Sequence, residues 1–395
     1  MRIALVITAL GAGGAERVII GLANAWAARG REVTLITFEP PGTPPYYELD
    51  PRVALRQLGV ASAARPIWRA LRQGVRRVRA LRRTLRTIEP EVAISFLAKI
   101  NVLTVLATRG LALPVIVSER NNPERQRFRA TWRWLRARLY GVAYCVVAPS
   151  RGVLESFPRA IRLRGRVIPN PVDLTPPQPR RSGTRRLVAV GRLVHQKGFD
   201  LLLRAFARIA PEHPEWTLAI WGEGDQRRHL EALRAELGVR QQVQLPGLTE
   251  RPGQWVEDAE IFVLSSRFES FGNVITEAMA AGLPVVAFDC PWGPGDILRD
   301  GEDGLLVAAE DVDALAATIR RLILDPELRH RLGEAGMRNV RRFHRDAIVA
   351  QWEAVIGEAV AATRNAPGVR GPHPAPAALE SPGQRAYGAE SERRC

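Results

Sequence analysis

The sequence predicts an α/β fold made of two doubly wound, Rossmann-like domains that face a central cleft. Short, continuously apolar segments alternate with helical segments along most of the chain, a pattern typical of parallel sheets covered by helices on both faces. A stretch dense in Pro, Arg and Gly, residues 171–186, divides the series in two and is predicted to be a linker. The length of 395 residues is enough for two or three domains of ordinary size.

The first domain, residues 1–170, is predicted to open with a strand at Arg2–Ile7. The Gly-rich turn Gly11–Gly14 then leads into an Ala-rich helix that stops at Gly30. Four further strands are expected from apolar runs at Glu32–Phe38, Val92–Phe96, Pro114–Ser118 and Tyr144–Ala148.

The second domain, residues 187–345, repeats the rhythm. We expect helices at Asp200–Ile209 and Gln226–Leu237. The expected strands are Leu187–Val190, Thr217–Trp221, Gln242–Leu245, Glu260–Leu264, Pro284–Phe288 and Leu305–Val307. A last helix at 346–363 could cross back to the first domain, and the composition of residues 364–395 predicts a disordered tail.

Composition indicates a globular protein outside the secretory pathway. Hydrophobic residues make up 46% of the chain and charged residues 25%, as in soluble domains. Three scattered cysteines form neither a disulfide framework nor a zinc site, which favours a reducing compartment. No apolar run reaches the roughly 18 residues of a membrane span. We therefore expect a cytoplasmic protein, with a peripheral position on the cytoplasmic face of the membrane as a second option.

Ligands of doubly wound domains bind at the carboxyl ends of the strands. The segment Gly191–Asp200 connects a strand to a helix, and it carries Arg192 and Lys197. Two cations beside a helix N-terminus can bind a diphosphate, whereas the alternative is two solvated cations on a surface loop. Trp221–Leu230 is a second such junction, with a Gly-x-Gly turn that is weak evidence alone.

The third junction, Ser265–Gly282, places two glutamates eight residues apart. If a helix begins near residues 271–273, Glu269 lies in the loop above the strand and Glu277 lies on the second helical turn. Both carboxylates then flank the unsatisfied N–H groups of the helix start. Sugar hydroxyls and a phosphate would suit this arrangement. A helix-start acid and a solvated glutamate explain it equally well on geometry alone.

Five motifs in order resemble the family-4 retaining glycosyltransferases of the GT-B fold. They are GGAE near the N-terminus, V-G-R-L-x-x-x-K-G, W-G-E-G, E-S-F-G-N-V-x-x-E-A-M-A-x-G-x-P-V-V and D-G-x-x-G-L-L-V. The resemblance covers about residues 1–350 and is sharpest between Gly191 and Val307. It implies a nucleotide-sugar donor bound by the second domain, an acceptor bound by the first, retention of configuration, and no metal or other cofactor.

The resemblance also implies roles for individual residues. Arg192 and Lys197 would hold the diphosphate, Glu269 would bind hydroxyls of the donor sugar, and Glu277 would bind those of the ribose. Glu269, Arg192 and Lys197 are the expected catalytic residues. The remaining donor-site residues would be Gly13, Gly14, Gly191, Gly222, Glu223, Phe271, Gly272, Asn273 and Val274.

The residues themselves agree with a reaction that needs no metal. No acid pair or His/Cys cluster has the spacing of a metal site, and two cations can neutralise a departing nucleoside diphosphate. The chain departs from some relatives by having no histidine in its first domain. There the segment after the strand Pro114–Ser118 offers Glu119, Arg120 and Asn121 to orient an acceptor.

The net charge of +16 arises almost entirely from two segments. Residues 61–88 contain nine arginines and no acid, and residues 120–138 contain seven arginines and one glutamate. Apolar residues at steps of three and four along 67–88 predict an amphipathic helix. It is either an ordinary surface helix or, with Arg-rich segments 65–86 and 120–138, a surface for anionic lipid headgroups. A lipid-linked sugar acceptor would suit that surface.

The function that the sequence supports best is transfer of a hexosyl or N-acetylhexosaminyl group from a nucleotide sugar to an acceptor sugar in polysaccharide or glycan assembly. UDP is the expected nucleotide because it is frequent in the family that the chain resembles. Two alternatives remain: a GT-B nucleotide-sugar epimerase, and a basic nucleic-acid-binding protein. No nucleic-acid recognition motif is evident, and the second domain is close to charge balance, so we expect no nucleic-acid partner.

Overall fold

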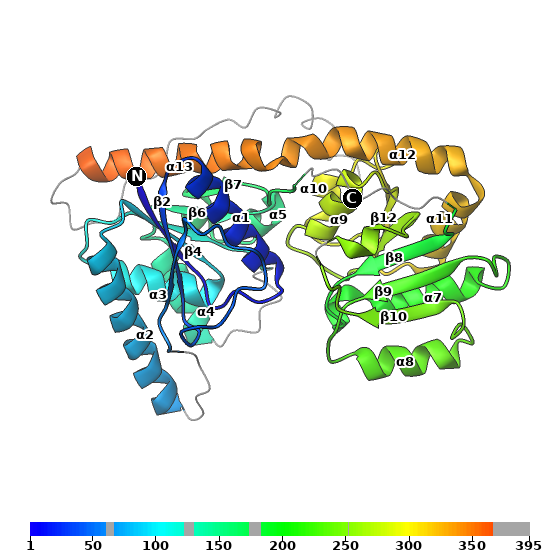
Figure 1. Ribbon diagram of the computed structural model, residues 1–395, viewed down its shortest axis with the longest axis horizontal. Coiled ribbons are helices and arrows are strands. Elements are labelled where there is room, and N and C mark those ends of the chain that lie inside the picture. Colours follow the sequence, from blue (N-terminus) through cyan, green and yellow to red (C-terminus); the bar gives the residue numbers. More distant parts are fainter. Residues whose placement is uncertain (61–66, 122–129, 174–182, 252, 366–395) are drawn as a thin grey trace.

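The computed structural model describes residues 1–60, 67–121, 130–173, 183–251 and 253–365. Figure 1 shows two α/β domains side by side, with one long helical segment running across both. Each domain contains a sheet of parallel strands. The fold class predicted from the sequence is therefore confirmed.

The first sheet has seven parallel strands in the order β3-β2-β1-β4-β5-β6-β7. Its strands are β1 (Arg2–Val6), β2 (Glu32–Thr37), β3 (Ala54–Gln57), β4 (Val92–Phe96), β5 (Val115–Ser118), β6 (Cys145–Ala148) and β7 (Gly165–Val167). Its helices are α1 (Gly14–Ala28), α2 (Ile67–Ile88), α3 (Ala98–Thr108), α4 (Ala130–Tyr140), α5 (Arg151–Glu155) and α6 (Arg159–Arg162). Alternate residues of β1 enter opposite cores, Ile3 and Leu5 on one face and Ala4 and Val6 on the other. Burial on both faces explains why the strand is an unbroken apolar run.

The second sheet has six parallel strands in the order β10-β9-β8-β11-β12-β13. Its strands are β8 (Arg186–Val190), β9 (Thr217–Trp221), β10 (Val243–Gly247), β11 (Ile261–Leu264), β12 (Val285–Asp289) and β13 (Leu305–Ala308). Its helices are α7 (Phe199–Ile209), α8 (Arg227–Glu236), α9 (Asn273–Ala280), α10 (Pro294–Ile297), α11 (Val312–Leu324) and α12 (Pro326–Asn339). Every strand expected here is present, with ends shifted by at most two residues.

The two sheets share one topology, and it places the site. In each sheet the strand order reverses between the first strand and the fourth, β1 beside β4 and β8 beside β11. Ligands of doubly wound sheets bind at such a switch point, at the carboxyl ends of the strands. The GAGG turn follows β1, and the segments of Arg192 and Glu269 follow β8 and β11.

Two strands of the first sheet were not expected from the sequence. β3 and β7 are the edge strands, and their residues are exposed or only partly buried. They therefore lack the continuous apolar pattern by which the inner strands are recognised.

The last helix, α13 (Arg345–Asn365), packs against α1 and β4 of the first domain, as the sequence suggested. It begins one residue earlier and ends two residues later than expected; the rest of the predicted tail, 366–395, lies outside the described residues. Trp352 is fully buried, with its ring 6.4 Å from that of Trp26 and 6.2 Å from that of Phe96. Helix α13 thus completes the core of the first domain.

The chain crosses between the domains twice, and the crossings touch. The first lies in the predicted linker, of which residues 174–182 are outside the described part, and the second leads into α13. Val172 forms a parallel bridge with His344, and its N–H donates to the Phe343 carbonyl at 2.9 Å. Arg345 forms an ion pair with Asp173 beside them.

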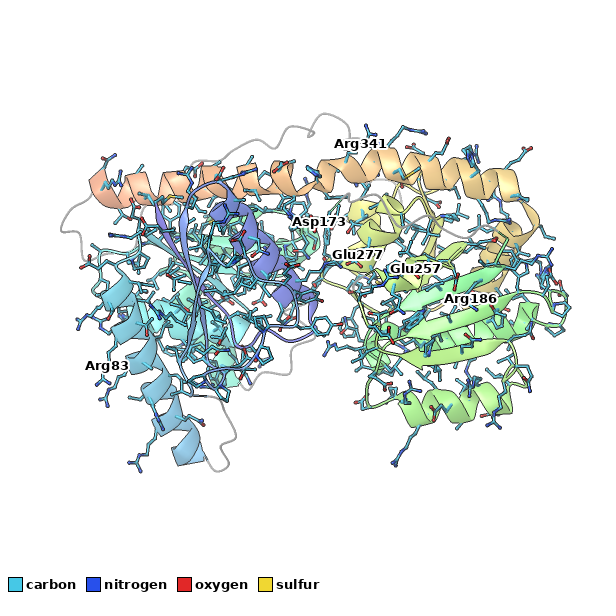
Figure 2. The ribbon with its side chains drawn as sticks, viewed as in Figure 1. Arg83, Asp173, Arg186, Glu257, Glu277 and Arg341 are labelled. Atoms are coloured by element: carbon cyan, nitrogen blue, oxygen red, sulfur yellow. The ribbon has the colours of Figure 1, made fainter. Side chains whose placement is uncertain are left out.

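The basic helix α2 packs only part of its length. Leu81 and Leu85 are buried in the first domain, whereas Val75 is 48% exposed. In Figure 1 the N-terminal end of α2 extends away from the domain, and in Figure 2 Arg83 points outward. Among the described residues, no helix is both long enough and apolar enough to span a bilayer.

We predict that Trp352→Ala lowers the free energy of unfolding by about 3–5 kcal/mol, because it opens a cavity among Trp26 and Phe96. Chemical denaturation followed by circular dichroism measures the loss. Trp134→Ala is the matched control, since Trp134 is 61% exposed and its removal should cost less than about 1 kcal/mol. Equal losses in the two variants would contradict the assigned position of α13.

Candidate active site

A buried ion pair lies at the carboxyl ends of β8 and β11. Lys197 Nζ donates to Glu269 Oε1 at 2.5 Å, and Ser266 Oγ donates to the same oxygen at 2.7 Å. Both side chains are mostly buried. No described residue hydrogen-bonds to Glu269 Oε2, and an ammonium group has three N–H donors. The pair can therefore offer one carboxylate oxygen and two N–H groups to a ligand.

Two loops hold this pair in place. Arg267 makes a bidentate ion pair with Asp200 at 2.8 and 2.7 Å, which joins the loop after β11 to the start of α7. Gln196 Nε2 donates to the Phe268 carbonyl at 3.0 Å, and the Arg267 N–H donates to the Gln196 carbonyl at 2.8 Å. The segment around Lys197 and the segment around Glu269 are therefore one connected unit.

The junction after β9 explains the requirement for Gly222. A side chain there would bring its Cβ to 1.9 Å from the Gly191 carbonyl oxygen, and its φ of 139° also favours glycine. Neighbouring Glu223, expected to touch the donor, is bound by Arg227 through three hydrogen bonds of 3.0, 2.8 and 2.6 Å. Its position at the carboxyl end of β9 is as expected, but its carboxylate is paired on the surface.

Two helix N-termini meet across the domain boundary. Helix α1 begins at Gly14, directly after the GAGG turn, and α9 begins at Asn273. A side chain at Gly14 would come within 3.1 Å of Asn273 Nδ2, so the two starts are in contact range. Each helix start carries unsatisfied N–H groups and a partial positive charge. Together they attract an anion, most strongly at the start of α9, because the carboxylate of Glu16 lies beside Gly13 at the start of α1, whereas the first turn of α9 has no acid.

The segment that leads into α9 is fixed by both domains. Phe271 is buried against Phe343, with ring centroids 5.5 Å apart, and Gly272 has a φ of 101°. Ser150 Oγ of the first domain donates to the Ser270 carbonyl at 2.9 Å, and Ser270 Oγ donates to the Arg120 carbonyl at 2.9 Å. Val274 follows on the first turn and is partly buried.

Glu277 lies where the domains meet (Figure 2), and its partner comes from the first domain. Arg17 on α1 donates to Glu277 Oε1, and the charge of Glu277 raises the pKa of Arg17. Tyr47 lies near this pair, and burial raises its pKa to about 12. The two glutamates are thus not partners of each other; each is paired with a separate cation.

Arg192 is exposed at the end of β8, and it faces an acid of the first domain. Burial raises the pKa of Glu16, and the positive charge of Arg192 partly offsets that rise. Glu16 follows the GAGG turn directly, so this pair also spans the boundary. Gly13 precedes α1 as its N-terminal cap residue.

The three residues expected to orient an acceptor have different environments. Glu119 is fully buried and accepts from the Tyr140 hydroxyl at 2.9 Å. Arg120 is 6% exposed, and its guanidinium lies 5.1 Å from the Phe96 ring and 5.7 Å from that of Trp352. Asn121 is exposed. Only Asn121 has a side chain that an acceptor could reach directly.

The structure therefore brings together the residues expected from β8, β11 and α9, and adds four that sequence reasoning missed: Glu16, Arg17, Ser150 and Asn170. The first two follow the GAGG turn within GGAER, which was a usable signal. Ser150 and Asn170 had no local signal. In the described ranges, no group of three or more His, Cys, Asp or Glu side chains could hold a metal ion.

Comparison with known proteins places these features in a family. Residues 12–176 match the family model described as Glycosyltransferase Family 4, and residues 174–339 match the model described as Glycosyl transferases group 1. A solved structure of Anabaena HepE in complex with UDP and glucose superposes with a TM-score of 0.75 at 20% identity, covering 90% of this chain and 99% of HepE.

Two curated relatives show how similarity is distributed. An exopolysaccharide phosphotransferase of Streptomyces coelicolor is 30% identical over 379 residues, covering 88% of this chain, but this chain spans only 40% of that protein's length. The second relative is GalNAc-α-(1→4)-GalNAc-α-(1→3)-diNAcBac-PP-undecaprenol α-1,4-N-acetyl-D-galactosaminyltransferase of Campylobacter jejuni. It is 28% identical over 365 residues, covering 91% of this chain and 99% of its own. The two adjoining family matches and the two-domain structure show that this chain belongs to the family-4 glycosyltransferases of the GT-B fold, enzymes that use nucleotide-sugar donors.

Proposed function

We propose that this enzyme transfers a hexosyl or N-acetylhexosaminyl group from a UDP-sugar, with retention of configuration, to a sugar acceptor carried on a lipid diphosphate. The observation that carries the proposal is the order of the groups along the polypeptide from β11 into α9. The Lys197–Glu269 pair, the two helix N-termini and Glu277 follow each other from the end of β11 along α9. A nucleotide sugar has the same order of chemistry: sugar hydroxyls, diphosphate and ribose hydroxyls.

The 2.5 Å contact between Lys197 and Glu269 supports the roles proposed for them. Groups in direct contact are suited to adjoining parts of one ligand, and the donor sugar is bonded to the diphosphate. Glu269 Oε2 would accept from a sugar hydroxyl, while Lys197 and Arg192 would bind the phosphate oxygens. Glu277 would use its second oxygen for the ribose, with Arg17 on the first.

In the reaction, a bond forms between the acceptor oxygen and the anomeric carbon as the bond from that carbon to the phosphate oxygen breaks. The proton of the acceptor hydroxyl passes to a phosphate oxygen. Negative charge grows on the departing diphosphate, where Lys197, Arg192 and both helix N-termini are placed to stabilise it. Retention requires the acceptor to approach on the face from which the diphosphate leaves.

UDP and a lipid-linked acceptor are supported by similar proteins. The HepE complex contains UDP and glucose, and the Campylobacter jejuni relative is named for an undecaprenol diphosphate acceptor. We further propose a peripheral position on the cytoplasmic face of the membrane. The exposed arginines of α2 and α4, and Trp134 beside Arg138, support it. An epimerase or a nucleic-acid-binding protein would give neither sugar transfer nor lipid-linked product.

We predict that a screen of UDP-, GDP- and ADP-sugars with lipid-linked acceptors finds one donor from which a sugar is transferred. Lys197→Ala should lower kcat about 10²–10³-fold, because it removes a cation aimed at the leaving group, and Glu269→Ala should abolish detectable transfer. Lys99→Ala is the matched control, since Lys99 is exposed on α3 and is the chain's other lysine. Transfer that survives both site variants would refute the roles, and interconversion of free nucleotide sugars would favour an epimerase.

We predict that EDTA leaves the transfer rate within about twofold of its value without chelator, since cationic side chains can supply the charge stabilisation that a metal otherwise provides. Initial rates with EDTA, and with added Mg²⁺ or Mn²⁺, measure this. A rate that EDTA abolishes and a divalent cation restores would show that the reaction needs a metal.

We predict that the protein co-sediments with anionic liposomes at low salt and that binding falls as salt rises, because exposed arginines attract lipid headgroups. Replacing Arg83, Arg86, Arg133 and Arg138 by glutamine should weaken binding at least about tenfold. The matched control makes the same change at exposed arginines of the second domain: Arg204, Arg228, Arg240 and Arg338. Absence of binding at low salt would remove the membrane proposal.

A further inference from the structure

A chain of three side chains connects the core of the first domain to the start of α9. Arg120 Nη1 donates to Asn170 Oδ1, and Asn170 Nδ2 donates to Asn273 Oδ1 at 2.6 Å. Arg120 and Asn170 are buried, at 6% and 7% exposure, while Asn273 is partly exposed at the domain boundary. The chain thus begins in the interior and ends where the two helix N-termini meet.

The direction of this chain is set by its buried end. Arginine has only donors, so the oxygen of Asn170 must face Arg120. The amide nitrogen of Asn170 must then face Asn273, and the oxygen of Asn273 must face Asn170. Reversing either amide would put two donors against each other. The Nδ2 group of Asn273 is therefore turned away from Asn170.

The free end of the chain lies beside the GAGG turn. A Cβ on Gly14 would be 3.1 Å from Asn273 Nδ2, and within the described residues Nδ2 has no hydrogen-bond acceptor. A donor group is thus presented between the starts of α1 and α9, where the backbone N–H groups are also donors. An anion is the ligand that satisfies all of them.

Resting on the function proposed above, we infer that Asn273 donates a hydrogen bond from Nδ2 to a phosphate oxygen of the nucleotide sugar, and that Asn170 and Arg120 are positioning residues that fix its direction. Arg120 never touches the ligand in this arrangement. Arg120, Asn170 and Asn273 form a hydrogen-bond relay. The role of Arg120 is to make the buried end of this relay a donor, so that the exposed end is also a donor. This gives Arg120 and Asn170 of the first domain an indirect part in donor binding.

The decisive change is Asn170→Asp. An aspartate still accepts from Arg120 but cannot donate to Asn273, so Asn273 should turn over and present its oxygen to the phosphate. UDP affinity should fall about 10-fold or more, the size of a hydrogen bond to a charged group. The thermal midpoint should stay or rise, because a carboxylate suits Arg120 at least as well as an amide does. A purely structural Asn170 would instead lower the midpoint.

Calorimetric titration with UDP and with uridine tests the inference in wild type, Asn170→Asp, Asn273→Ala and the double variant. Both single variants should lose UDP affinity and keep uridine affinity, because uridine lacks the phosphates. Asn170→Asp should cost at most about twofold more in the Asn273→Ala background, since it acts through Asn273. Independent losses in the two backgrounds, or parallel loss of uridine binding, would overturn the relay.

Two further measurements keep the outcomes separate. Asn365→Asp, at the exposed end of α13, makes the same chemical change elsewhere and should bind UDP as wild type does. If Asn170→Asp does not fold, Asn273→Asp should weaken UDP binding more than Asn273→Ala, and the reverse order would refute the inference. Wild-type protein that binds none of UDP, GDP and ADP would refute the proposed function; normal UDP binding by Asn170→Asp would refute only the relay.

Discussion

The convergence of two helix N-termini at the domain boundary is the constraint on which the rest of the site depends. Each sheet reverses its strand order at its centre, and this brings the segments after β1, β8 and β11 to one cleft. Two positive helix ends repel each other, so bringing α1 and α9 together has an energetic cost. The Arg17–Glu277 ion pair, the Ser150–Ser270 hydrogen bond and the Asn170–Asn273 hydrogen bond offset that cost. An anionic diphosphate at this position would relieve the repulsion directly.

The charges of the site are balanced locally, unlike those of the whole chain. Lys197 is paired with Glu269, Arg17 with Glu277, and Arg192 lies near Glu16. The positive excess is instead carried by the segments that contain α2 and α4. The chain contains only two lysines among 57 basic residues, and one of them is Lys197. A compact ammonium group fits beside a buried carboxylate and keeps free donors, whereas the larger guanidinium would demand a planar partner.

The sequence predicted the elements that short runs of apolar residues define, namely the buried strands and the turns that follow them. Buried strands such as β8 and β11 are mostly apolar runs, and the turns after them place Arg192, Lys197 and Glu269 at one edge of the second sheet. The edge strands β3 and β7 were missed because their exposed residues carry no such pattern.

Contacts between the domains could not be predicted from the sequence either, because they depend on how two separately folded units meet. Arg17 and Glu277 are 260 residues apart, and Asn170 and Asn273 are 103 apart. Arg17, Glu277 and Asn273 lie in recognisable motifs, but nothing in those segments identifies the partner across the boundary. Glu119 was predicted to orient an acceptor from its place after β5, yet its side chain turns into the core towards Tyr140. The position of a residue directly after a strand does not show whether its side chain points into the core or out of the protein.

The bridge between Val172 and His344 also has a mechanical meaning. Two connections set far apart would allow the domains to shear or twist, but two connections bonded to each other act as one pivot. The domains can then rotate relative to each other about that point, which acts as a hinge. The contacts of α9 and its preceding loop with the first domain, made by Arg17, Ser150 and Asn170, can then form or break together as the domains rotate. Closing on a donor would be a single motion rather than a series of separate adjustments.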